Sequence, residues 1–98
     1  MSRVKTPEMD EFFRAILSLK TEEECYLFFS DLCTINELKS MSQRFQVALE
    51  LDAGKNYNEV YERTGVSTAT ICRVKKCVEY GNGGYRLVLD RLAEEDIH

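Results

Sequence analysis

Several features are scarce in this chain of 98 residues, and each scarcity excludes a class of protein. The chain has one proline, Pro7, and few strand-like alternations, which favours an all-α fold. It has no apolar run of about 18 residues, so no transmembrane helix is predicted. The N-terminal residues lack an apolar signal segment, and we therefore expect a cytoplasmic protein.

Residues that bind metals or catalyse reactions are scarce as well. The single histidine is His98, and the cysteine pairs Cys25/Cys33 and Cys72/Cys77 both lack the CxxC spacing of a zinc site. We expect reduced thiols that pack as small apolar groups, with a redox or metal role as the alternative. A glycine-rich phosphate loop and a paired nucleophile and base are also missing. The sequence therefore predicts neither an enzyme nor a bound metal or cofactor.

The length allows one domain with a modest core. Helix-start signals occur at Thr6 followed by Pro7, and in two predicted capping boxes, Thr21 to Glu24 and Thr34 to Glu37. With the apolar periodicity, they predict six helices. The first predicted helix begins at Thr6–Pro7 and the second at Thr21. The other four span about residues 34–53, 58–63, 67–80 and 85–95.

Two of the predicted helices have informative apolar faces. The second carries the run Tyr26 to Phe29, which is more apolar surface than a small monomer needs and favours a subunit interface. Arg44 lies within the apolar stripe of the third helix. Either its methylene groups pack on apolar surface while the guanidinium group reaches water, or the guanidinium group contacts a ligand. The predicted buried residues of this helix are Leu38, Met41, Phe45, Ala48, Leu49 and Leu51.

The stretch from Gly54 to Tyr85 carries the most specific pattern. Two short apolar-periodic segments flank Gly65, at which we expect a backbone with positive φ. This pattern predicts a helix-turn-helix whose second helix, residues 67–80, enters the major groove of DNA. Its predicted small core consists of Val60, Val66, Ile71 and Val74.

The distribution of charge agrees with this prediction. The chain has a net charge of −4, yet residues 55–86 carry six Lys or Arg and only three Glu, a net +3. The flanking segments 1–54 and 87–98 are acidic. Positive charge thus gathers on the predicted helix-turn-helix, where it could meet phosphates.

The start of the second helix carries small residues, which permit close approach to the groove floor. A threonine can hydrogen-bond base edges, and alanine or a threonine methyl can contact a thymine methyl. Tyr61 stands where many such motifs carry alanine, so a plain packing hairpin stays an alternative. The predicted DNA-binding residues are Tyr57, Asn58, Arg63, Ser67, Thr68, Ala69, Thr70, Cys72, Arg73, Lys75 and Lys76.

The segment GVSTATICRV, together with the preceding helix that contains Thr34 and Arg44, resembles the Trp repressor. The trailing KKCVEYGNGGY is similar to the narrower YerC/YecD group of bacterial Trp-repressor-like proteins. The resemblance covers about residues 8–95. It implies a six-helix, all-α, Trp-repressor-like helix-turn-helix fold and an intertwined homodimer. The chain would form one domain, with dimerisation helices in 1–53, the helix-turn-helix in 54–80 and a C-terminal helix in 85–95.

The resemblance also implies a corepressor pocket, in which two arginines could sandwich an aromatic ring. Val74 stands where that family has glycine, and Cys77 where it has serine. Because a valine side chain would project into the volume of an indole, we do not expect L-tryptophan as a corepressor; another effector stays open. The residues implied for this pocket are Thr34, Arg44 and Arg73.

These observations favour a sequence-specific DNA-binding transcriptional regulator, a repressor, that binds double-stranded DNA as a homodimer. The alternative is a helical protein–protein interaction module without specific DNA binding. The acidic net charge and the apolar N-terminal helices favour that alternative.

Overall fold

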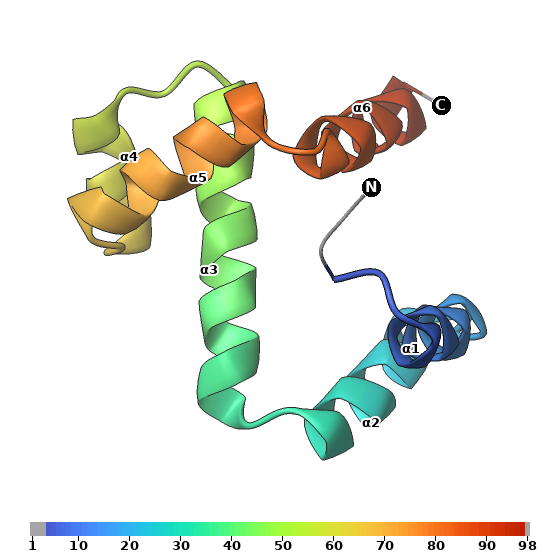
Figure 1. The fold of residues 1–98 in the computed structure, drawn as a ribbon. Coiled ribbons are helices and arrows are strands. Elements are labelled where there is room, and N and C mark those ends of the chain that lie inside the picture. Colours follow the sequence, from blue (N-terminus) through green and yellow to red (C-terminus); the bar gives the residue numbers. More distant parts are fainter. Residues whose placement is uncertain (1–3, 98) are drawn as a thin grey trace. The chain divides into compact units, whose positions relative to one another are not determined.

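The computed structural model describes residues 4–97, and all regular structure in that range is helical (Figure 1). This confirms the predicted all-α class with six helices. The chain separates into two compact units, with the boundary between Leu38 and Lys39, and each unit is described by itself. The helices are α1 (Pro7–Leu17), α2 (Glu22–Leu32), α3 (Ile35–Asp52), α4 (Tyr57–Thr64), α5 (Thr68–Tyr80) and α6 (Gly84–Ile97).

Side-chain caps begin the first three helices. The Thr6 hydroxyl accepts a hydrogen bond from the Met9 amide, as the sequence predicts. The capping box at Thr34 is confirmed: its hydroxyl accepts from the Glu37 amide at 3.1 Å, and its own amide donates to the Glu37 carboxylate at 2.8 Å. These two hydrogen bonds from Thr34 lower the pKa of Glu37.

The predicted capping box at Thr21 is wrong in its second half. The Thr21 hydroxyl accepts from the Glu24 amide at 3.1 Å. The Glu24 carboxylate, however, accepts from the amide of Lys20 at 2.7 Å, one residue before the cap. Glu24 thus accepts a hydrogen bond from a backbone amide outside the helix. Hydrogen bonds of residues before and after Thr21 therefore both stabilise the turn into α2.

The N-terminal unit, which contains α1 and α2, buries little. The rings of Phe12 and Phe28 lie 6.5 Å apart between their centroids and join the two helices. None of the described residues of α1 or α2 is buried. Its large apolar side chains therefore remain a surface available for a partner. The exposed large apolar side chains of α1 and α2 are Phe13, Leu17, Tyr26, Leu27 and Leu32.

The C-terminal unit has a closed core at which α3, α4, α5 and α6 meet. Figure 1 shows α4 and α5 beside the C-terminal half of α3. The core lies there, so the predicted stripe of α3 is only partly right. Val47, which the prediction omits, is fully buried, and Met41 is 42% exposed. Of the other predicted residues, Ala48 is buried, and the half-buried ones are Leu38, Phe45, Leu49 and Leu51. Met41 precedes the part of α3 that the other helices cover. The buried residues are Val47, Ala48, Val60, Val66, Ile71, Val74 and Leu89.

The helix-turn-helix forms as predicted, with all four expected core residues buried. Gly65 ends α4 with φ 70°, a left-handed conformation. Helix α4 is one residue longer at each end than predicted, because Asn56 caps it and forms a capping box with Glu59. Tyr61 is 54% exposed, so its bulk points away from the packed hairpin.

Helix α6 begins at Gly84, one residue earlier than predicted. Arg86 links α6 to α3. Its guanidinium group donates hydrogen bonds to the carboxylates of Asp52 in α3 and Asp90 in α6, each at 2.9 Å. The hydrogen bonds to Asp52 and then Asp90 raise the pKa of Arg86. Leu89 of α6 is buried, whereas Leu87 is 51% exposed.

All four cysteines are free thiols, and none is buried. The expectation that they pack as small apolar groups is wrong for Cys25 and Cys77, which are exposed at the helix surface. Within residues 4–97, no three His, Cys, Asp or Glu side chains gather in a way that could hold a metal ion. His98 lies outside the described residues. No described helix is long and apolar enough to cross a membrane.

Replacing Gly65 with alanine is expected to lower the free energy of unfolding by about 1–2 kcal/mol, measured by urea denaturation. A Cβ at this position meets no atom within 4 Å, so the cost comes from the positive φ alone. Gly84→Ala is the matched control, because it has open space and no positive φ. Equal stability of the Gly65 variant and the wild type would show that the turn tolerates an ordinary residue.

Candidate nucleic-acid interface

Helix α5 separates an apolar face from a polar one. Ile71 and Val74 are buried, and Val78 packs against the core one turn later. The opposite face exposes Ala69, Arg73, Lys76 and Tyr80. This face of α5 is the surface that could approach another molecule.

The N-terminal end of α5 carries short side chains and has a side-chain cap. Ser67 accepts a hydrogen bond from the Thr70 amide at 3.3 Å and donates one to the Thr70 hydroxyl at 3.1 Å. Thr68 and Ala69 are exposed beside this cap. A helix end with short side chains can come close to base edges, and its free amides attract a phosphate.

Three cations among the predicted DNA-binding residues, Arg63, Arg73 and Lys76, fall into two groups by their partners. Arg73 and Lys76 are exposed, and neither forms an ion pair with any residue that the structure describes. Arg63 instead donates to the Glu50 carboxylate at 2.7 Å, and Glu50 is only 14% exposed. The ion pair of Arg63 joins α4 to α3.

Tyr57 begins α4 and is half-buried against the core. A hydrogen bond with the Cys72 side chain raises the pKa of Tyr57, and desolvation and the charges of Cys72 and Glu79 add to the shift. The ammonium group of Lys75 lies 5.3 Å from the centroid of the Tyr57 ring. Tyr57 therefore connects the two helices of the motif, while Asn58 beside it is exposed.

Arg44 and Arg73 come together at an open pocket of about 360 Å³. The Arg44 guanidinium donates a long hydrogen bond of 3.5 Å to the Ser40 carbonyl. Thr34, the third residue implied for this pocket, caps α3 and belongs to the other unit. The remaining lining residues come from α3, the turn and the start of α5: Ser40, Gln43, Gly65, Val66, Ser67 and Thr70.

Val74 does not project into this pocket. It is 2% exposed within the core, and it is not a lining residue. The expectation that a valine at this position excludes an indole stays a prediction. Periodicity explains the placement, because residue 74 shares the buried face of α5 with Ile71, whereas Arg73 points to the pocket side.

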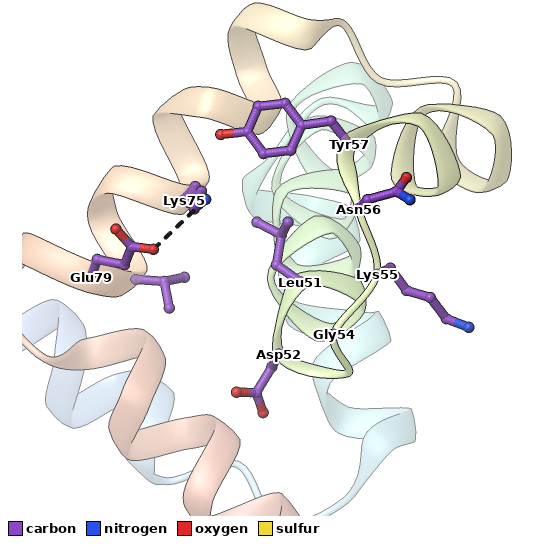
Figure 2. A pocket seen from close by; sticks show the side chains of 9 residues that line it. Leu51, Asp52, Gly54, Lys55, Asn56, Tyr57, Lys75 and Glu79 are labelled. Carbon is purple, nitrogen blue, oxygen red and sulfur yellow. Dashed lines mark ion pairs between the residues drawn. The ribbon is translucent and has the colours of Figure 1, made fainter.

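A second pocket, of about 540 Å³, lies on the side of α5 that carries Lys75 (Figure 2). Three of its four charged side chains have ion-pair partners: Lys75 pairs with Glu79, and Asp52 with Arg86. The fourth, Lys55, forms no ion pair within the described residues. The residues that line it are Leu51, Asp52, Gly54, Lys55, Asn56, Tyr57, Lys75, Val78 and Glu79.

Sequence reasoning missed two kinds of residue at this surface. Tyr80 is 83% exposed on the outer face of α5, four residues after Lys76, and that spacing could have shown it. The acidic partners were missed as well. The spacing of four between Lys75 and Glu79 signals a helical ion pair, whereas no local signal connects Arg63 with Glu50.

Comparisons with known proteins agree with this geometry. The sequence model of the Trp repressor protein family matches residues 7–93. The uncharacterized protein YerC of Bacillus subtilis (strain 168) is 50% identical over 96 residues, which cover 98% of this chain and 92% of YerC.

Two solved structures are also similar. The crystal structure of a TrpR-like protein from Eubacterium eligens has a TM-score of 0.89 and 50% identity, over 93% of this chain and 94% of that one. A candidate Trp repressor from Staphylococcus aureus has a TM-score of 0.89 and 47% identity, over 93% and 91% of the two chains.

Proposed function

Because the chain belongs to the Trp repressor family, we propose that it is a sequence-specific DNA-binding transcriptional regulator that acts as a repressor. The observation that carries the proposal is the exposed face of α5. It joins small residues at the helix N-terminus to two cations, Arg73 and Lys76, that have no ion-pair partner in the described part of the chain. The proposed activity is binding, and it needs no catalytic step.

In the proposed complex, the start of α5 reads bases in the major groove. Thr68 and Ala69 are small, exposed and next to the capped helix end. The cations further along α5 contact phosphates, which fix the position of the helix without selecting a sequence. The protein would act on the chromosome in the cytoplasm.

The proposed DNA-binding form is a homodimer. The N-terminal unit leaves large apolar side chains exposed, including Leu17 at 81% and Tyr26 at 75%, and a second copy of the chain could cover them. Two α5 helices related by a twofold axis would meet successive major grooves about 34 Å apart. A pseudo-palindromic site follows from that symmetry.

We propose that DNA binding does not require L-tryptophan. The pocket of Arg44 and Arg73 is lined mainly by polar side chains, and Val66 is its one apolar side chain among the described residues. An indole gains most of its affinity from apolar contact. A different effector, with a carboxylate or phosphate for the two arginines, would suit these residues better.

One observation favours a second candidate function. The exposed apolar surface of α1 and α2 could receive a different protein rather than a second copy. In that case, the protein would be an interaction module without specific DNA binding, and a stoichiometric partner would be recovered in the absence of DNA.

Selection of bound duplexes from random DNA by the purified protein tests the proposal. We expect enrichment of one pseudo-palindromic sequence, bound about 10³-fold or more tightly than bulk DNA at physiological salt. The enriched sequence and its affinity should be the same with and without L-tryptophan. Binding no stronger than to bulk DNA would contradict the regulator, and enrichment only with tryptophan would contradict independence from that ligand.

A further inference from the structure

The ammonium group of Lys75 lies between two side chains of its own chain. It is 5.3 Å from the centroid of the Tyr57 ring and 4.0 Å from the Glu79 carboxylate. Figure 2 shows Lys75 between these residues, with a dashed line to Glu79. The side chains of Lys75 and Glu79 are each 46% exposed, so water and an incoming phosphate can reach both of them.

The next residue in the chain provides a contrast. Lys76 has the same chemistry and is exposed, but no ion pair is found for it within the described residues. A backbone phosphate would thus meet one lysine that is free and one that already has a carboxylate and an aromatic face as partners. Both contacts of Lys75 are weak at exposed sites, so a phosphate can replace them.

Tyr57 keeps the arrangement in place. Its ring packs against the core of the C-terminal unit, so it is a fixed surface rather than a mobile side chain. Cys72, which lies on the same helix as Lys75 and Glu79, is the main cause of the raised pKa of Tyr57. The position of the Lys75 ammonium is therefore set by α4 as well as by its own helix.

We propose that Tyr57 and Glu79 are positioning residues that hold the Lys75 ammonium away from DNA phosphates, so that Glu79 competes with the phosphate for Lys75 and limits the affinity for DNA. This inference rests on the proposed DNA-binding function. Glu79 would thus weaken DNA binding, whereas the cations of the interface would strengthen it.

Replacing Glu79 with glutamine is expected to tighten DNA binding. The gain should be about threefold for each α5, which is about tenfold for a dimer, because a released lysine replaces an exposed helical ion pair. The dependence of affinity on salt should also steepen by about one unit of slope for each released lysine. Fluorescence anisotropy of a labelled duplex, titrated at several salt concentrations, measures both quantities.

Two comparisons separate this effect from a simple loss of negative charge. Glu62→Gln removes a carboxylate from α4 that has no ion pair within the described residues, so it reports the general effect of charge. In the Lys75→Met background, the gain from Glu79→Gln should fall to the size seen for Glu62→Gln. An equal gain with and without Lys75 would overturn the proposal.

A measurement on the protein without DNA tests the contact itself. After reductive methylation with a ¹³C label, the dimethylated Lys75 should show an NMR signal shifted upfield by the Tyr57 ring. Tyr57→Phe should keep that shift, and Tyr57→Leu should abolish it. A Lys75 signal that coincides with that of Lys76 in the wild type would overturn the proposed position of the ammonium group.

The failure of this inference can be distinguished from the failure of the proposed function. Phosphate contacts do not depend on sequence, so the same variants can be compared on bulk duplex DNA even if no specific site exists. Coupling between Lys75 and Glu79 on bulk DNA would support the inference while the sequence-specific regulator fails. Additive effects on a specific site would overturn the inference while the regulator stands.

Discussion

Replacing Arg73 and Lys76 together with alanine is expected to lower the affinity for every DNA sequence by two to three orders of magnitude, roughly, at physiological salt. In a homodimer the change removes four cations that face outward from α5 and that no described carboxylate neutralises. The slope of log affinity against log salt should fall by about four units, since each phosphate contact contributes about 0.9. Anisotropy titrations across salt concentrations measure both effects.

Two controls show whether these cations act on phosphates. Arg91→Ala removes an exposed cation from α6, outside the helix-turn-helix, and should change affinity little. Thr68→Val should change the preferred sequence and leave the salt slope intact, because a base contact carries no counterion release. A double variant that keeps the wild-type salt slope would contradict the assignment of Arg73 and Lys76.

Replacing Ile71 with alanine is expected to lower the free energy of unfolding by about 3–4 kcal/mol. Ile71 is fully buried in the core that also holds Val47 and Val60, so the change leaves a cavity at the centre of the unit. A loss of that size is a large fraction of the stability of a domain of this length. Urea denaturation followed by circular dichroism measures it, at a fixed protomer concentration because a dimer is stabilised by mass action.

The size of the removed group gives a graded control for this prediction. Ile71→Val removes one methylene and should cost about 1 kcal/mol. If the alanine variant were as stable as the valine variant, the surroundings of Ile71 would have collapsed around the gap. The core of the C-terminal unit would then be less rigidly packed than its burial indicates.

The sequence was most informative where a local interaction decides the structure. The cap at Thr6, the capping box of Thr34 and the positive φ of Gly65 all depend on residues within four positions of each other. The buried set of the helix-turn-helix was predictable for the same reason, because period and turn together fix which face of each helix is covered. The fold and the location of the candidate interface could therefore be predicted from the residues.

Contacts between helices that are distant in sequence could not be predicted in this way. Which part of α3 is covered depends on where α4, α5 and α6 pack, and for that reason Val47 was missed and Met41 was wrongly placed inside. The partner of Arg63 is Glu50, 13 residues earlier, and no periodic pattern connects them. Charge counting showed that the motif is basic, but only the folded structure divides its cations into paired and unpaired groups.

The division of the chain at Leu38 and Lys39 has a consequence for how the protein is made. During synthesis, α1 and α2 leave the ribosome before the helices that build the closed core. None of their described residues is buried, so the nascent chain first displays an apolar surface that it cannot cover by itself. In the proposed homodimer, this surface of α1 and α2 would be covered only on encounter with another chain. Newly made protein at low concentration would therefore be most vulnerable to proteolysis and aggregation at its N-terminal helices.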